Sequence, residues 1–312
     1  MRFLLLLFTL GSYLSATVYE DAYFAYKRGD YNVAIELLTP LANQGDAQAQ
    51  NSLGSFYYEG TGVVKDIQKG IDLFLQAAKN GSKRAQYKLG VLYQYGMNVK
   101  KDYASALFWY EKSAAQNYAW AQTNLANMYV NAYGVEKNYN TAQKLYMKAA
   151  LQGNAQAQNN VAAFYYNPEF GLKLDNKKAL MWYKKAAEQG HLKALLTLAI
   201  MYEMGKGTPK NYKLALKYYL EGSKKGYIQS FFHLGRLYEH GKGVEQDDKK
   251  AFSYYVRAAK DGFAQAQFAT ARFWYFGKGK KVNIEKAKKW LDIAARQGNN
   301  DAQQFTVQYK LK

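Results

Sequence analysis

An Ala-Gln pair recurs along this chain at a nearly constant interval, and this interval constrains the fold more than any other feature. The alanine column runs through Ala49, Ala85, Ala121, Ala157, Ala194, Ser230, Ala266 and Ala302. Successive members lie 36 residues apart, apart from one interval of 37. A fixed period of this length is typical of stacked copies of one supersecondary unit, each of which contacts only its neighbours. The function of such a chain has to be argued from the surface of the array.

Two further columns predict the first helix of each period, which we name helix A. A leucine followed by glycine or alanine stands four residues after the alanine, as in Leu53-Gly54 and Leu89-Gly90. An aromatic residue such as Tyr57 stands four residues further on. Positions i, i+4 and i+8 share one face of an α-helix, so the three columns form one buried face. The small residue beside the leucine lets a neighbouring helix approach closely.

A second helix, named helix B, is predicted in each period after a pair of glycines such as Gly205 and Gly207. Glycine readily adopts the positive φ that a chain needs where a helix stops and turns. Aromatic residues then recur at helical spacing and lead to small residues such as Ala77-Ala78, followed by a glycine such as Gly81. Each period is therefore predicted to be an antiparallel helix pair.

The combined pattern A-Q-x-x-L-G-x-x-Y-x-x-G-x-G, followed by A-x-x-W-Y-x-x-A-A-x-x-G, resembles the Sel-one-like repeat family, a relative of the tetratricopeptide repeats. The resemblance covers seven units over residues 46–298. It implies an all-α, right-handed superhelical solenoid of antiparallel helix pairs that serves as an interaction scaffold. Four places depart from the pattern, one of which is the turn of the fourth unit, with Ala132 and Gly134. The third unit has Tyr118 near its missing terminal glycine, the segment 167–171 is one residue longer and is predicted to protrude, and Thr270 stands in the leucine column.

Both ends of the array are predicted to be capped. Residues 17–45 match a shorter helix pair, with a second helix that stops near Pro40 or Gly45, and residues 299–312 match a single closing helix. The terminal units of a solenoid have one face without a neighbour, so atypical caps are expected there.

Residues 1–16 are predicted to be a secretory signal peptide. A basic start at Arg2 precedes the short apolar run Phe3–Leu10, and the small residues Ser15-Ala16 follow, so cleavage after Ala16 is expected. The apolar run is too short for a membrane span. The chain has no cysteine, which excludes disulfides and a lipobox anchor. We expect an exported protein of bacterial type, in the periplasm or secreted.

The net charge of +19 has two interpretations. The lysines outside the packing columns either form a solvated face or attract anionic partners such as acidic polysaccharide, lipid headgroups or an acidic protein. Nucleic acid would suit the charge, but the predicted export and the absence of a nucleic-acid-binding motif argue against it.

The sequence offers little for catalysis. The G-x-G pairs lie between predicted helices and recur in several periods, so they are interpreted as turns and not as phosphate-binding loops. The histidines, His191, His233 and His240, have no carboxylate in register for a metal site. No G-x-S-x-G elbow occurs, and no S-x-x-K motif supports the β-lactamase label that some cysteine-rich relatives carry. We expect neither an enzyme nor a bound cofactor or metal, and a hydrolase is kept only as a remote alternative.

Helix A lines the concave face of the related tetratricopeptide solenoids, and this register implies a set of contact residues for a protein or peptide partner. They lie five and two residues before, and two and five after, the leucine column: Arg84, Tyr87, Trp120, Asn127, Tyr166, Lys193, Glu203, Phe232, Arg236, Phe268, Arg272 and Tyr275. Any of these rings can equally serve packing between helices. Trp120, Arg236 and Arg272 are the strongest candidates because no packing column accounts for them.

Two functional hypotheses follow from the sequence. The first is an exported scaffold that binds a protein or peptide in its concave face. The second is an envelope factor that binds an anionic glycan or a membrane surface through its lysine-rich face. Salt separates them, because charge-dominated binding weakens as ionic strength rises.

Overall fold

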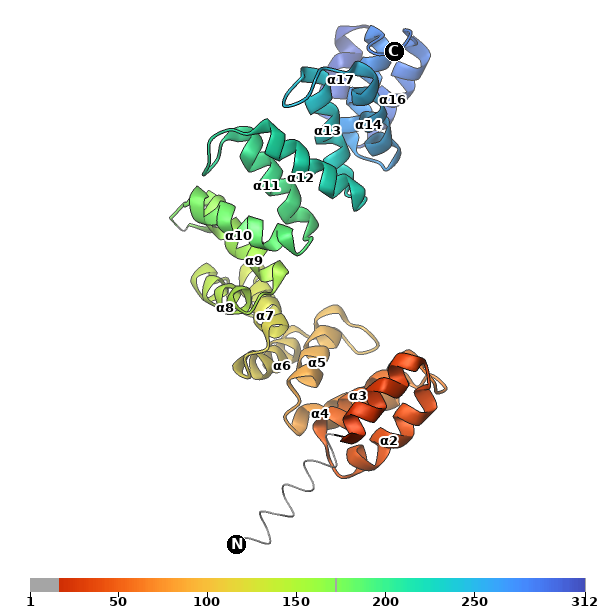
Figure 1. The fold of residues 1–312 in the computed structure, drawn as a ribbon, viewed down its shortest axis with the longest axis vertical. Coiled ribbons are helices and arrows are strands. Elements are labelled where there is room, and N and C mark those ends of the chain that lie inside the picture. Colours follow the sequence, from red (N-terminus) through yellow and green to blue (C-terminus); the bar gives the residue numbers. More distant parts are fainter. Residues whose placement is uncertain (1–16, 172, 312) are drawn as a thin grey trace. The chain divides into compact units, whose positions relative to one another are not determined.

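The structure, a computed structural model, describes residues 17–171 and 173–311. The predicted signal peptide, residues 1–16, lies outside the described residues. All regular secondary structure in the described ranges is helical, so the predicted all-α class is confirmed (Figure 1). No helix among these residues is long and apolar enough to cross a membrane. The chain divides into two compact units, Met1–Asn154 and Ala155–Lys312.

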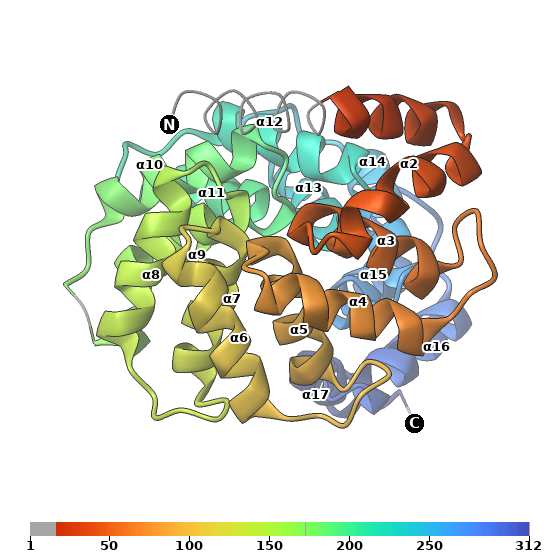
Figure 2. The same cartoon turned by 90° about the horizontal axis from the view of Figure 1, so that it is seen from below.

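The first unit alternates A and B helices. It begins with the helical residues 17–28 and continues through α2 (Tyr31–Asn43), α3 (Ala47–Glu59), α4 (Ile67–Lys79), α5 (Lys83–Tyr95), α6 (Tyr103–Ala115), α7 (Ala119–Asn131) and α8 (Tyr139–Leu151). Odd-numbered helices are A helices and even-numbered helices are B helices. Consecutive helices from α3 to α7 pack side by side, as Figure 2 shows.

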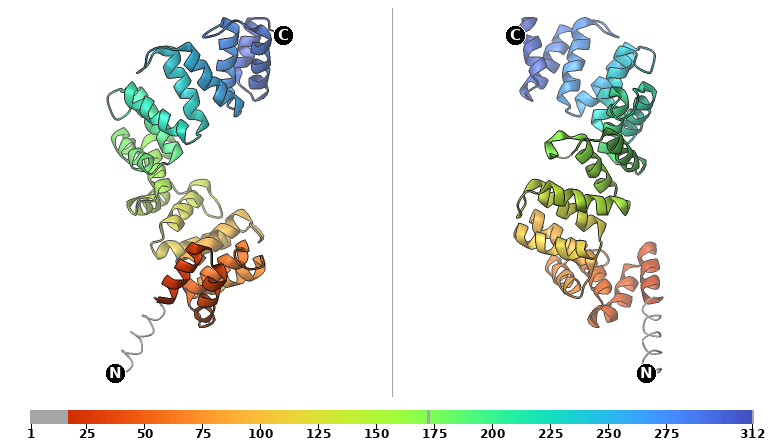
Figure 3. Two further views of the ribbon diagram at one scale, coloured as in Figure 1. Left: turned by 45° about the vertical axis from the view of Figure 1, so that its right-hand side comes forward. Right: turned by 90° about the vertical axis from the view of Figure 1, so that its left-hand side faces the viewer.

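The second unit continues the same alternation. It contains α9 (Ala155–Tyr166), the 3-10 turn η1 (Pro168–Phe170), α10 (Asn176–Glu188), α11 (Leu192–Met204), α12 (Tyr212–Lys224), α13 (Ile228–His240), α14 (Asp248–Lys260), α15 (Ala264–Phe276), α16 (Ile284–Arg296) and α17 (Asn300–Gln308). These helices again follow one another as antiparallel pairs, drawn in green to blue in Figure 3.

The glycine beside the leucine column leaves space for an aromatic ring of helix B to pack against helix A. A Cβ added at Gly90 would lie 2.5 Å from the ring of Tyr110, and one added at Gly235 would lie 2.6 Å from the ring of Tyr255. Both tyrosines are almost completely buried. The small residue is therefore required by a side chain of the partner helix.

The glutamine of the Ala-Gln pair joins three helices. Gln50 donates from Nε2 to the backbone oxygen of Ala42, near the end of α2, at 3.0 Å. Its Oε1 accepts a hydrogen bond of 2.9 Å from Asn80, which caps α4. Carbonyls in the last turn of a helix have no partner within the helix. The carbonyl of Ala42 accepts from the amide of Gly45, and the glutamine adds a second hydrogen bond to it. The same arrangement recurs at Gln86, Gln122 and Gln267. Leu195 and Phe231 interrupt it in the second unit.

The structure decides between the two predicted stops of the helix before residue 46. Pro40 lies inside α2 and does not stop it. The helix continues to Asn43, because the amide of Gln44 closes the last turn onto the carbonyls of Pro40 and Leu41. Gly45 then turns the chain with a φ of 90°. Of the two predicted stops, Gly45 is the one that operates.

Residues other than glycine hold two of the irregular turns. Asn117 adopts a φ of 57° in the third unit, where most units have a glycine, and Ala132 adopts a φ of 56° at the end of α7. The longer segment 167–171 folds into η1, and Phe170 stacks on Phe164 with ring centroids 4.3 Å apart. This part of the segment is thus anchored to α9.

Candidate functional site

A cavity of about 570 Å³ opens in the first unit, lined mainly by A helices. Its walls come from the helical residues 17–28, from α3 and α5, and from Tyr118 at the N-cap of α7. Leu38 of α2 and Thr61 complete the lining. The A helices therefore supply the recessed surface here, as the family register implies.

Aromatic rings form one wall of the cavity. Tyr23 and Tyr26, on the helix of residues 17–28, are 55% and 47% exposed, which is unusual for rings of this size. Tyr26 packs edge-on against Phe56 of α3, with ring centroids 5.9 Å apart. The rings are thus held in place by the fold and still present apolar area to solvent.

Basic side chains of α5 also line the cavity. Lys88 is mostly buried, its Nζ donates a hydrogen bond to Ser55 Oγ, and it lies 4.5 Å from the centre of the Phe74 ring. Burial lowers the pKa of Lys88 to about 8, and the charge of Arg84 acts in the same direction, against the opposing effect of Glu59. Arg84 is exposed one helical turn earlier and also lines the cavity.

Asn51 of α3 contributes a buried polar group to the same cavity. The residue is 7% exposed, and its Oδ1 has no hydrogen-bond partner within the described part of the chain. A buried acceptor without a partner is costly, because it has lost its water without a replacement.

Of the predicted contact residues, only Arg84 lines this cavity. Tyr87 packs between Tyr110 and Tyr118, at centroid distances of 6.0 and 5.4 Å. Asn127 accepts a hydrogen bond from the hydroxyl of Tyr146. Trp120, on the first turn of α7, is 52% exposed.

Arg236 and Arg272 have structural partners that the sequence did not reveal. Arg236 lies 3.5 Å from Glu203 of the preceding A helix, and Arg272 lies 3.0 Å from Glu239. The premise that no packing role accounts for these arginines is therefore corrected. Ion pairs between successive repeats account for them, and the binding role itself stays a prediction.

Glu239 is the most buried member of this charged group. The hydroxyl of Tyr255 donates to it at 2.7 Å and Lys278 lies 3.1 Å away. Burial alone would raise the pKa of Glu239, but these two hydrogen bonds and the charge of Arg272 outweigh it and hold the pKa below its ordinary value. Glu203 likewise accepts a 2.8 Å hydrogen bond from the hydroxyl of Tyr219.

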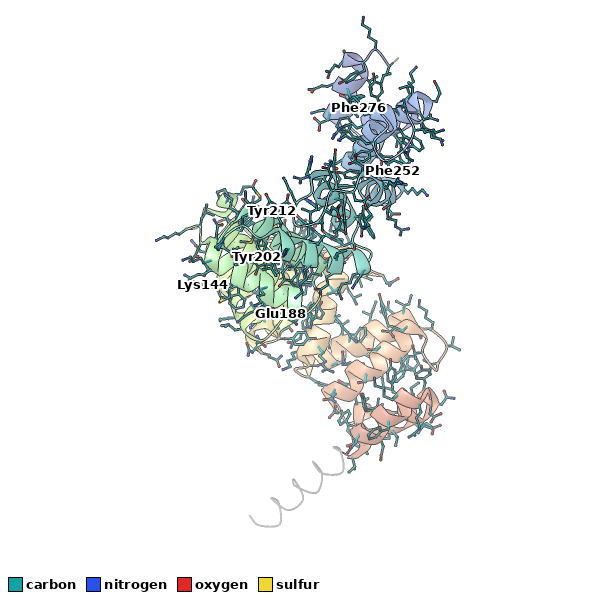
Figure 4. All side chains as sticks on the ribbon, turned by 45° about the horizontal axis from the view of Figure 1, so that its top comes forward. Lys144, Glu188, Tyr202, Tyr212, Phe252 and Phe276 are labelled. Atoms are coloured by element: carbon teal, nitrogen blue, oxygen red, sulfur yellow. The ribbon has the colours of Figure 1, made fainter. Side chains whose placement is uncertain are left out.

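The remaining predicted rings pack between helices of the second unit. Tyr166 meets Tyr183, Phe232 meets Tyr255 and Phe263, Phe268 meets Phe305, and Tyr275 meets Phe305 and Tyr309. Lys193 is exposed. Figure 4 shows how densely side chains fill this unit around Tyr202 and Tyr212. Both tyrosines pack against the buried cluster that contains Tyr219 and Leu234.

Most residues that line the cavity are not among the predicted contact residues. The same register applied to Leu53 selects Gln48, Asn51, Ser55 and Tyr58, of which the first three line the cavity. The sequence thus carries a signal for these three residues. Lys88 stands one position before the leucine column, outside this register, and only the structure places it in the cavity.

The histidines bring no metal site together. His233 is mostly buried and stacks on Tyr219 with ring centroids 4.8 Å apart. Burial, together with the charge of Arg236, lowers the pKa of His233 to about 4. In the described ranges no three histidine, aspartate or glutamate side chains converge as a metal site would require.

Comparison with models of known protein families identifies the repeat. The Sel1 repeat model matches eight segments, at residues 16–46, 47–82, 83–118, 121–154, 155–191, 192–227, 232–263 and 264–299. The chain belongs to the Sel1 repeat family. Its proteins typically serve as non-enzymatic scaffolds for protein–protein interaction. The first matched segment is the helix pair that the sequence analysis treats as a cap.

Two crystal structures resemble this one closely. One is a protective antigen of uropathogenic Escherichia coli with an SLR fold, 34% identical, with a TM-score of 0.78 over 86% of this chain. The match spans 57% of that antigen. The other is a Sel1 repeat protein of Oxalobacter formigenes, 30% identical, with a TM-score of 0.70 over 79% of this chain and 99% of its own. The comparison with curated proteins gives no match.

Proposed function

We propose that this protein is a non-catalytic scaffold that binds a protein or peptide on the face formed by its A helices, with the first-unit cavity as a principal contact. The observation that carries the proposal is the lining of this cavity. Exposed tyrosines and basic side chains line it together, held by successive A helices. Tyrosine and arginine are enriched among the residues that dominate interface energies.

The size of the cavity suits a short stretch of a partner chain. Its volume of about 570 Å³ falls within the range of roughly 300–1,000 Å³ typical of binding clefts. Rigid rings such as Tyr23 and Tyr26 lose little conformational entropy when they are covered, which favours their use as contact surface.

We also propose that the protein is exported. The support is the apolar run after Arg2 and the small residues before Thr17. That a 34% identical relative is described as a protective antigen agrees with an exposed location. Cell fractionation followed by N-terminal sequencing tests the proposal. Thr17 as the mature N terminus in the periplasm or medium would support it, and an uncleaved cytoplasmic chain would contradict it.

The lysine-rich surface supports a second candidate, binding to an anionic glycan or membrane, through the net charge of +19. Part of this excess has a structural use, because lysines lie over aromatic rings in several repeats. Lys69 Nζ is 3.8 Å from the centre of the Tyr57 ring, and Lys286 Nζ is 4.5 Å from that of Trp274. Binding that disappears between low and physiological salt would favour this candidate.

Site-specific photo-crosslinking tests the scaffold proposal. A photoreactive phenylalanine analogue replaces Tyr23 in the cavity and, as the control, Phe108 on the B helix α6, which is 48% exposed. A discrete crosslinked protein from position 23, absent from position 108, is expected. Equal crosslinking from both positions, or none from position 23, would contradict the proposed face.

A further inference from the structure

The two basic residues of the first-unit cavity have no acidic partner. Among residues 17–171 and 173–311, Lys88 and Arg84 make no ion pair within 4 Å, although Glu59 lines the same cavity. An ammonium group that is mostly buried and held by one hydroxyl and one ring face is poorly compensated. Such a group gains from an anion that enters the cavity.

The net charge of the residues that line the cavity indicates the charge of the ligand that would neutralise it. Arg84 and Lys88 contribute two positive charges and Glu59 one negative, so 2 − 1 leaves a net charge of +1. A single carboxylate balances this sum.

Asn51, whose side-chain Oδ1 has no hydrogen-bond partner in the described part of the chain, lines the same cavity as the lysine. Ser55 links the Asn51 backbone to the lysine, because its hydroxyl accepts from Lys88 Nζ and donates to the backbone oxygen of Asn51 at 3.0 Å. A ligand that brings a donor for Asn51 Oδ1 and an anion for Lys88 would satisfy both residues. A peptide supplies both, since its backbone amides are donors and its carboxylates are anions.

We propose that the first-unit cavity recognises a carboxylate on an extended peptide segment, with the anion at Lys88 and Arg84 and a backbone amide at Asn51. An apolar side chain next to the carboxylate then covers the exposed rings of Tyr23 and Tyr26. This inference rests on the proposed function and specifies the chemistry of its partner. The carboxylate belongs either to an acidic side chain or to a chain terminus.

A synthetic array of nine-residue peptides, immobilised through their N termini, separates these sources. One form carries an internal Asp or Glu and an amidated C terminus, and its counterpart replaces the acid by Asn or Gln. A third form has no acidic residue and a free terminal carboxylate, and its counterpart is amidated. Remaining positions are randomised with aromatic and aliphatic residues. The full chain is the probe, and fluorescence anisotropy then measures the best binders.

Lys88→Met and Arg84→Gln remove the proposed charges. Lys144→Met, on the exposed surface of α8 (Figure 4), is the control that removes one lysine elsewhere in the same unit. Loss of a charge-assisted hydrogen bond corresponds to roughly 10- to 100-fold in affinity. We expect such a loss for Lys88→Met, a smaller one for the exposed Arg84→Gln and none for Lys144→Met. Circular dichroism verifies that each variant is folded.

Proton uptake gives a second readout that a merely structural lysine would not show. Burial and Arg84 hold the pKa of Lys88 near 8 against the charge of Glu59, so a bound carboxylate should raise it. Calorimetry at pH 8.5 in buffers of different ionisation enthalpy should then show proton uptake with the wild type and not with Lys88→Met.

The outcomes separate the inference from the proposed function. Binding that requires a carboxylate and is lost in Lys88→Met supports both. Peptides that bind equally well as amides, with affinities unchanged by Lys88→Met, overturn the carboxylate inference and leave peptide binding intact. If no array peptide binds, peptide recognition by this face is wrong as well.

Discussion

Lys88 in the first unit and His233 in the second occupy the same position of the repeat, one residue before the leucine column, yet their surroundings differ. Both are mostly buried bases set against an aromatic ring of the preceding B helix, Phe74 and Tyr219 respectively. Around His233, the neighbouring Glu203 is already held by Tyr219 and Arg236. Lys88 makes no ion pair with an acidic side chain among the described residues.

This difference in ion pairing indicates which charged side chains on the A helices are free to bind a ligand. Glu203 and Glu239 of the second unit are each paired with an arginine of the following repeat, so these ion pairs stabilise the stack of repeats. The cation of the first unit is compensated only in part by the fold. Arginines in a predicted groove are therefore weak evidence of binding until their partners are known.

The largest loss of stability is expected when the group of paired charges around Glu239 is disrupted. Glu239→Ala should lower the free energy of unfolding by about 3 kcal/mol, because removal of the buried carboxylate leaves one buried hydroxyl and two partly buried cations without their acceptor. The groups concerned are Arg272, Lys278 and Tyr255. Urea unfolding followed by circular dichroism measures it. A change below about 1 kcal/mol would show that the set is no more than a surface network.

Lys88 should make stability depend on alkaline pH. Its folded pKa of about 8 lies below the ordinary value of 10.5, so the unfolded chain binds the proton more tightly. Stability should rise with pH between about 8 and 10.5, by up to about 3 kcal/mol relative to Lys88→Met. The neighbouring groups Arg84 and Glu59 remain in both proteins, so the difference isolates the lysine. Parallel pH curves for the two proteins would refute the compensation argument.

His233 should confer a similar dependence on the acid side. Its folded pKa of about 4 lies below the ordinary 6.5, so protonation favours the unfolded chain. Stability should fall as pH drops from about 6.5 towards 4, by up to about 3 kcal/mol. His233→Phe keeps a ring against Tyr219 and should remove this part of the acid sensitivity, while Glu203 and Arg236 stay in place. Thermal melts of both proteins across this range make the comparison.

The glutamine that joins three helices should have the smallest effect of the four. Gln86→Leu imitates Leu195, which stands at this position in the second unit. It removes one hydrogen bond from the carbonyl of Ala78 and one from the amide of Gln116, and both groups keep their bond to the backbone of Gly81. We expect a loss of about 1 kcal/mol, the typical net contribution of an intramolecular hydrogen bond. Gln116→Ala, at an exposed position, serves as the milder comparison. An unchanged urea midpoint for Gln86→Leu would mean that leucine packing replaces the hydrogen bonds completely.

The helix pairs were predictable because their signals are local. A buried stripe, a turn glycine and a run of small residues all lie within one period. The sequence left the end of α2 open between Pro40 and Gly45, and only the structure decides it, since Pro40 is tolerated where other amides close the last turn. Among the candidate contacts, Arg84 lines the first-unit cavity and its binding role stays a prediction, whereas most predicted rings pack between helices.

The sequence by itself determined the repeat, its two helices, and the family to which the chain belongs. Tertiary structure alone decided which charges are compensated and which are available. The reason is physical: the Arg236–Glu203, Arg272–Glu239 and Lys88–Ser55 contacts each join residues 33 positions apart. These contacts form only when one repeat is stacked on the next, and the periodicity within a repeat carries no information about their pairing.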